Sequence, residues 1–213
     1  MADSAFFCTL SHEGVLAVRG ADAGKFLQGQ LTCNLDYLGD TRASLGARCT
    51  QKGRMQSSFR ILLEGDGVLM AMATELLEPQ LADLKKYAVF SKSKLTDESA
   101  AWVRFGIEQG DAALLGLGLE LPAETDSVVR NGGLVAIRVS PDRVELWAPA
   151  DQADVLKGKL SALLALMIAG LILFCVVHED AERKTLGTVR EYLTLPPERF
   201  QELLGLMQES RGA

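Results

Sequence analysis

Two kinds of hydrophobic periodicity alternate along the first 160 or so residues. Short apolar runs bounded by glycine or polar turns predict strands, and apolar residues at helical spacing predict helices between them. Gly20 allows a tight turn before the first helix, and Asp22 is placed to cap that helix. The first series of predicted strands and helices covers Val15–Arg19, Ala23–Leu31, Ser44–Thr50, Met55–Leu63, Val68–Ala73 and Glu75–Tyr87.

A second series repeats part of this order. Its predicted elements are a strand, a helix, two strands and a helix at Trp102–Glu108, Ala112–Leu117, Leu134–Val139, Val144–Trp147 and Gln152–Leu160. Neighbouring strands joined by tight turns form antiparallel sheets, and amphipathic helices then cover those sheets. The sequence therefore predicts an α+β fold, whose two series we interpret as arms of one intertwined domain rather than separable domains.

The pattern changes at Leu160. The segment Leu160–Val177 has no charged residue and is long enough for a membrane-spanning helix. A fully buried core helix and an artefactual or frameshifted tail are the alternatives. We divide the chain into residues 1–159, 160–177 and 178–213. In the last part the pattern predicts an amphipathic helix, Glu198–Gln208, which we expect to dock on its own chain or on a partner.

Composition narrows the functional classes. The chain has 213 residues, 48% of them hydrophobic, with a net charge of -6 and a pI of about 5.1. A negative net charge argues against broad nucleic-acid binding, although it leaves room for a local basic patch. The N-terminus lacks the pattern of a signal peptide, so we expect a cytoplasmic protein. If Leu160–Val177 spans a membrane, the N-terminal region stays in the cytoplasm.

Residues that usually carry catalysis or bind metals form no motif here. The two histidines, His12 and His178, stand alone, and the four cysteines form no Cys-x-x-Cys pair. The sequence also lacks a nucleophile elbow, a P-loop and a dinucleotide fingerprint. We therefore predict no catalytic residue and no metal ligand, and expect a binding protein rather than an enzyme.

Two basic clusters contrast with the acidic composition. One comprises Lys52 and Arg54 at a predicted hairpin turn, and the other lies at and beyond the end of the Glu75–Tyr87 helix. These clusters either serve solvation and the helix dipole or bind an anion. A folate fits the second interpretation, because it combines carboxylates with a flat ring. Lysines suit the carboxylates, aromatic walls such as Tyr87 suit the ring, and glutamine amides suit the ring edge.

Three segments, in this order, resemble the YgfZ family: Gly20–Leu35, Leu45–Met55 and Glu78–Lys92. This family comprises folate-binding relatives of the glycine-cleavage T-protein. The resemblance implies a T-protein-like fold with a folate pocket. It also implies an accessory role in assembling or repairing iron–sulfur clusters, which affects tRNA modification indirectly. The positions that match the family are Gly20, Asp22, Phe26, Gln28, Gly29, Gln30, Thr32, Lys52, Gly53, Lys85, Lys86, Tyr87 and Lys92.

Together with the basic clusters, the resemblance predicts a site for tetrahydrofolate or a derivative. Its predicted residues are Gln28, Gln30, Lys52, Arg54, Lys85, Lys86, Tyr87 and Lys92. The implied partners are folate and iron–sulfur enzymes or assembly proteins, with no direct nucleic-acid contact expected. A hydrophobic stripe left exposed by missing sequence would favour self-association.

The chain departs from the family in its second half. The family's later motif, Lys-Gly-Cys-Tyr-x-Gly-Gln-Glu, is absent, and the resemblance stops near Leu160. We expect this loss to impair the thiol-dependent part of the function. Two alternatives therefore remain: a non-catalytic, membrane-anchored interaction protein that keeps the fold, and a tetrahydrofolate-dependent aminomethyltransferase.

Overall fold

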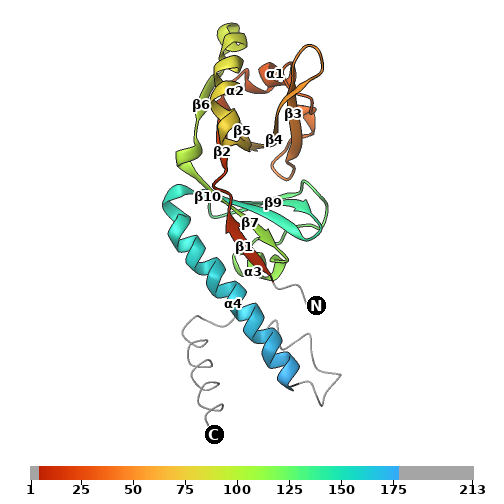
Figure 1. Cartoon of the computed structure of the whole chain (residues 1–213), viewed down its shortest axis with the longest axis vertical. Coiled ribbons are helices and arrows are strands. Elements are labelled where there is room, and N and C mark those ends of the chain that lie inside the picture. The colour runs from red at the N-terminus through yellow and green to blue at the C-terminus, as the bar shows by residue number, and fades with distance from the viewer. Residues whose placement is uncertain (1–4, 178–213) are drawn as a thin grey trace. The chain divides into compact units, whose positions relative to one another are not determined.

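The computed structural model describes residues 5–177, with side-chain burial given as far as Leu166 (Figure 1). The chain divides into one unit at Met1–Leu160 and a second at Ser161–Ala213. The predicted tail helix Glu198–Gln208 lies outside the described residues. All of the strands described below belong to the first unit.

Two antiparallel five-stranded sheets form the framework of this first unit. One sheet, here called sheet B, contains in spatial order β3 (Ser44–Cys49), β4 (Met55–Glu64), β5 (Gly67–Ala73), β2 (Glu13–Arg19) and β6 (Lys94–Asp97). Strand β2 lies between β5 and β6, with Leu16 opposite Met70 and Val18 opposite Leu95. Sheet B thus joins segments from the beginning and the middle of the sequence.

The other sheet, sheet A, contains in spatial order β1 (Phe6–Thr9), β7 (Trp102–Glu108), β10 (Arg143–Pro149), β9 (Leu134–Ser140) and β8 (Val128–Asn131). Its edge strand β1 precedes all of sheet B in the sequence, and Phe6 lies opposite Glu108. The chain therefore starts in sheet A, builds sheet B and returns to complete sheet A. The two series of elements are interlocked by this path.

Helices complete the described structure. They are α1 (Ala23–Gln28), α2 (Thr74–Tyr87), α3 (Asp111–Gly116) and α4 (Ala153–Val177), with short 3-10 turns η1 (Leu35–Tyr37), η2 (Ala88–Phe90), η3 (Ser99–Ala101) and η4 (Ala150–Gln152). The first helix ends three residues earlier than predicted, because Gly29 terminates it. Strands β1, β6 and β8 were not predicted as strands, since each is only four residues long.

Strand alternation sorts the apolar side chains onto opposite faces of the sheets. Leu16 and Val18 of β2 pack with α1 and α2 on one face of sheet B. Val15 and Ala17 of the same strand face sheet A and pack in one cluster with its buried Trp147. The other face of sheet A is covered by α3 and the first turns of α4. The unit is therefore layered as helices, sheet, sheet and helices.

The helix α4 includes the apolar segment Leu160–Val177. Leu156 and Leu160 are buried against sheet A. Among the residues that the structure describes, no helix is long and apolar enough to span a membrane.

A charged network lies within the interface between the two sheets. Glu145 of β10 accepts a hydrogen bond from Arg104 of β7 at 2.7 Å and lies 3.9 Å from Arg60 of β4. Arg104 also pairs with Glu13 of β2, and its guanidinium lies 4.4 Å from the centre of the Trp147 ring. The side chains of Arg104 and Glu145 are only 3% and 15% exposed. Arginines from both sheets therefore converge on the partly buried carboxylate of Glu145.

We predict that Glu145→Gln strongly destabilises the fold. The substitution keeps the shape of the side chain but removes the negative charge between Arg60 and Arg104. Breaking a buried ion pair by removing one partner costs about 3–5 kcal/mol. Urea unfolding followed by circular dichroism measures the loss. The control Glu108→Gln removes an ion pair with the exposed Arg143 and should cost less than about 1 kcal/mol. Equal losses for the two variants would contradict the prediction.

Candidate functional site

The turn before α1 contacts the segment that follows α2, which brings two of the family-like motifs together. Gly20 has φ of +114°, and a Cβ at this position would lie 2.4 Å from the carbonyl oxygen of Lys92. The Asp22 carboxylate accepts a hydrogen bond from the backbone N–H of Lys92 at 2.9 Å. The predicted cap is therefore wrong: Asp22 makes no side-chain hydrogen bond to α1, because its carboxylate holds Lys92 instead.

The remaining family-like motif is connected to α2 by a buried arginine. Arg48 of β3 is 4% exposed and donates to Gln80 at 3.2 Å and to Asp83 at 2.6 Å. Its guanidinium also lies 5.7 Å from the centre of the Tyr87 ring. The hydrogen bond from Arg48, and a second from Lys86, hold the pKa of the Asp83 carboxyl below its usual range. This clamp fixes the C-terminal part of α2 against sheet B.

The two predicted glutamines lie at the end of α1. The side-chain oxygen of Gln28 accepts a hydrogen bond from the backbone N–H of Leu35 at 2.8 Å, which fixes the loop after the helix. Gln30 is half-buried in the following turn. A hollow of about 550 Å³ opens beside this helix. Its lining residues are Gly24, Lys25, Gln28, Gly29, Leu35 and Asp36.

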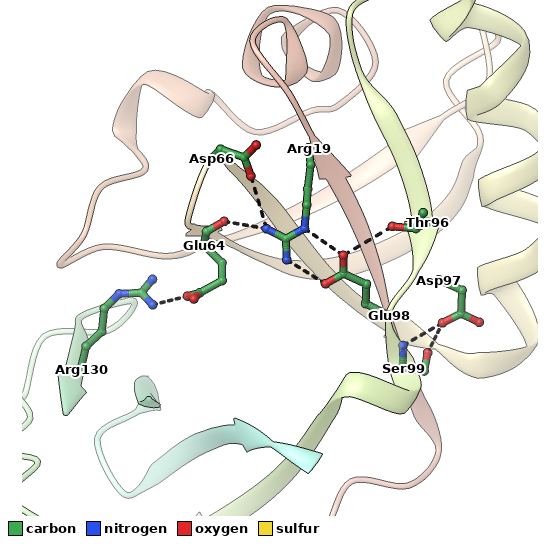
Figure 2. A network of polar contacts seen from close by, with 8 residues as sticks. All are labelled: Arg19, Glu64, Asp66, Thr96, Asp97, Glu98, Ser99 and Arg130. Atoms are coloured by element: carbon green, nitrogen blue, oxygen red, sulfur yellow. Dashed lines mark hydrogen bonds and ion pairs between the residues drawn. The ribbon is translucent and has the colours of Figure 1, made fainter. Parts of the chain in front are cut away.

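A second hollow, of about 510 Å³, lies beside the end of β2. Its lining residues are Arg19, Gly20, Asp66, Ser91, Lys92, Ser93 and Lys94. Figure 2 shows that Arg19 is held by both carboxylate oxygens of Glu98, each at 2.8 Å, and by the backbone carbonyl of Glu64. The hydrogen bond to Glu98 raises the pKa of Arg19, and the same contact lowers the pKa of Glu98. Arg19 therefore stabilises the wall of this hollow through its contacts with Glu98 and Glu64.

The hairpin residues lie apart from both hollows. Lys52 and Arg54 are exposed at the turn between β3 and β4, where Gly53 takes φ of +74° as its predicted role requires. Lys85, Lys86 and Tyr87 also line neither hollow. Of the eight predicted residues, the first hollow thus includes Gln28 and the second includes Lys92.

Several of these connections were missed by sequence reasoning. The Arg48–Asp83 pair joins residues from distant elements, and Lys25 was not singled out although it lines the first hollow. The alternation along β3 gave no signal for the Arg48–Asp83 pair, because the apolar Leu45 and Ala47 lie on the opposite face of the strand from the buried Arg48. A charged residue at such a buried position needs a partner on a covering element.

Comparison with known proteins supports the resemblance. The "tRNA-modifying protein YgfZ" of an O157:H7 strain of Escherichia coli is 39% identical over 126 residues, which cover 58% of this chain and 38% of that protein. Over this stretch the chain is similar to YgfZ. The YgfZ of other Escherichia coli strains is 37% identical over the same length. No protein-family model matches the chain. The chain spans 38% of the length of these YgfZ proteins.

Solved structures show the same fold. The glycine cleavage system aminomethyltransferase T from Bartonella henselae matches with a TM-score of 0.63 and 18% identity, over 74% of this chain and 45% of that protein. A chain of heterotetrameric sarcosine oxidase from Corynebacterium matches with a TM-score of 0.51 and 14% identity, over 76% of this chain and 84% of that chain. The predicted T-protein-like α+β architecture is therefore confirmed.

We predict that Gly20→Ala destabilises the junction with Lys92. The new Cβ meets a backbone oxygen and the backbone keeps a positive φ, so the expected loss is about 1–3 kcal/mol. Faster hydrogen exchange at the Lys92 amide should accompany the loss. The control Gly24→Ala lies in α1 with open space around it, and should be neutral or slightly stabilising. A similar effect at both glycines would disprove the role assigned to the close approach.

We also predict a pH-dependent contribution from Glu98. Because its pKa in the folded protein is lower than its ordinary value of 4.5, the Arg19–Glu98 contact stabilises the fold above that value. The contribution is lost as the pH falls through the lower, folded pKa. The stability difference between the wild type and Glu98→Gln should be full at neutral pH and shrink toward about pH 3. Urea unfolding at both pH values measures it, with exposed Glu120→Gln as the control. A difference that does not change with pH would contradict the assignment.

Proposed function

We propose that this chain acts as a YgfZ-type accessory protein that binds a reduced folate. In this role it assists the assembly or repair of iron–sulfur clusters, and tRNA modification depends on it through iron–sulfur enzymes. The observation that carries the proposal is the homology to "tRNA-modifying protein YgfZ" over 126 residues. The chain spans 38% of that protein, so the activity of the whole relative is itself part of the proposal.

The hollow beside α1 supports this proposal, because its lining offers groups of the kind that recognise a folate. The hydrogen bond from Leu35 uses the side-chain oxygen of Gln28 and leaves its amide nitrogen to donate to the edge of a pterin ring. Lys25 supplies a cation for a glutamate carboxylate, and Leu35 supplies an apolar wall. We therefore place the ring in this hollow.

The other predicted residues stay predictions for the folate site. Lys92 lines the second hollow, and Lys85, Lys86 and Tyr87 lie at the end of α2. Lys52 and Arg54 at the hairpin turn are further candidates. A comparison between variants in the α1 hollow and variants at α2 decides which set contacts the ligand.

The test is calorimetric titration of the full chain with tetrahydrofolate. We expect a dissociation constant in the micromolar range. Gln28→Glu should weaken binding about tenfold or more, because it removes the amide donor and adds a negative charge but keeps an oxygen for the Leu35 N–H. Lys25→Ala should weaken binding through the carboxylate alone, so the loss should disappear with a ligand that lacks the glutamate tail.

Lys85→Ala is the matched control for Lys25→Ala, since both remove one exposed lysine. An equal or larger loss with Lys85→Ala would move the site to the end of α2. No binding by a well-folded chain would overturn the folate proposal. A separate experiment expresses the chain in Escherichia coli that lacks YgfZ and measures tRNA modification. Restored modification supports the accessory role, and no restoration opposes it.

A further inference from the structure

A surface made of lysines and exposed rings runs from the end of α2 through η2 into β6. We call it the lysine–aromatic strip, and it consists of Lys85, Lys86, Tyr87, Val89, Phe90, Lys92 and Lys94. Phe90 is 100% exposed, Val89 is 70% exposed and Tyr87 is 55% exposed. Together these three side chains form an exposed apolar patch, which core packing does not explain.

The strip is positively charged although the chain as a whole is acidic. It contains four lysines and no acidic residue between positions 85 and 94, whereas the net charge of the chain is -6. Within the described part of the chain, Lys86 forms an ion pair with Asp83, and the other three lysines form none. Asp22 and Asp66 lie nearby, but Asp22 holds the Lys92 backbone and Asp66 faces Arg19. The charge of the strip is therefore available to an anionic partner.

The helix dipole does not account for this surface. Lys85 and Lys86 lie in the last turn of α2, where cations interact favourably with the carbonyl end of a helix. Lys92 and Lys94 lie beyond both α2 and η2, outside the range of that interaction. The helix dipole also does not explain why the uncharged ring of Phe90 is exposed.

The strip is held in place from below at two points. Arg48 lies beneath Tyr87, where its guanidinium is fixed by Gln80 and Asp83. At the other end, the Asp22 carboxylate and the close approach of Gly20 fix the backbone at Lys92. A surface whose ends are anchored loses little conformational freedom when it binds a partner.

We propose that the lysine–aromatic strip binds a single-stranded segment of nucleic acid. Bases stack on the rings of Tyr87 and Phe90, and the lysines on either side of the rings follow the phosphates. Over ten positions, two lysines precede the two rings and two follow them, so a strand whose bases stack on the rings can place phosphates against the lysines on both sides. The expectation of no direct nucleic-acid contact rested on the net charge of the whole chain. That sum does not reveal a local cluster of positive charge such as this strip. This inference goes beyond the proposed function and uses a different surface from the α1 hollow.

The experiment titrates the full chain into a fluorescently labelled single-stranded RNA of about twelve nucleotides, within the usual range of site sizes. Anisotropy is recorded at several salt concentrations. The slope of log affinity against log salt should become less steep by about 0.7 for each lysine replaced, in Lys85→Ala, Lys92→Ala and Lys94→Ala. Phe90→Ala should weaken binding about fivefold or more and leave the slope unchanged, since stacking releases no counterions.

Matched controls carry the same substitutions elsewhere on the surface. Tyr37→Ala removes a ring that is 70% exposed, and Lys157→Ala removes an exposed lysine of α4. Neither should change RNA affinity. Gln28→Glu should also leave it unchanged, so a failure of the folate proposal and a failure of this one can be told apart.

Three results would overturn the proposal. The first is RNA binding that Phe90→Ala and the lysine variants do not affect. The second is equal affinity for a duplex of the same length, whose bases are not free to stack on protein rings. The third is the absence of RNA binding by the folded chain. Phe90-dependent binding to phosphatidylserine vesicles would then identify the strip as a membrane-contacting surface instead.

Discussion

The packing of the two sheets against each other depends on the ion pairs of Glu145. Arg104 approaches it along sheet A, and Arg60 approaches from sheet B. Charges removed from water are costly unless they are paired in good geometry. A shift of one sheet along the other would separate these charges inside an apolar layer that also contains Trp147. The ion network therefore disfavours alternative packings of the sheets, and the apolar contacts provide most of the attraction.

The positions of the functional surfaces follow from this packing. Sheet B carries α1 and α2 on its outer face, and Arg48 fixes the end of α2 at Asp83. The Gly20 turn holds the chain at Lys92, so the α1 hollow and the lysine–aromatic strip are both attached to a common sheet. Binding surfaces on rigid elements are more precise than those on unsupported loops. Two chemically different surfaces can then be arranged around one layer of strands.

Much of the fold could be predicted because its strands follow simple patterns. Val15–Val18 and Val68–Met72 are buried on both faces and form continuous apolar runs, and the leucines of α2 recur at helical spacing. By contrast, β6 contains a single buried residue, Leu95, so its sequence gives no strand signal. It becomes a strand because the exposed edge of β2 pairs with it. Tertiary pairing of this kind cannot be read from local propensity.

The sequence indicated the residues of the candidate site but not their partners. The family-like motifs contain Gly20, Asp22 and Lys92, which the structure brings together, yet the hydrogen bond from the Lys92 amide to Asp22 spans 70 residues. From the local sequence we predicted that the Asp22 carboxylate accepts hydrogen bonds from the nearby backbone N–H groups of α1, and this prediction was wrong. The exposure of Phe90 was equally hidden, since an apolar residue beside a helix end normally packs inward. In both cases the deciding contact, or its absence, depends on distant segments.

The pairing of β1 with β7 has a consequence for how the chain is made. Strand β1 leaves the ribosome before the other described strands, but its partner β7 ends only at Glu108. All strands of sheet B lie between Glu13 and Asp97, so this sheet can assemble before β7 is available to pair with β1. Contacts between such distant segments are entropically costly to close and form late. During synthesis, Phe6 and Phe7 are therefore exposed on an unpaired strand that is open to chaperones or to the same strand of another nascent chain.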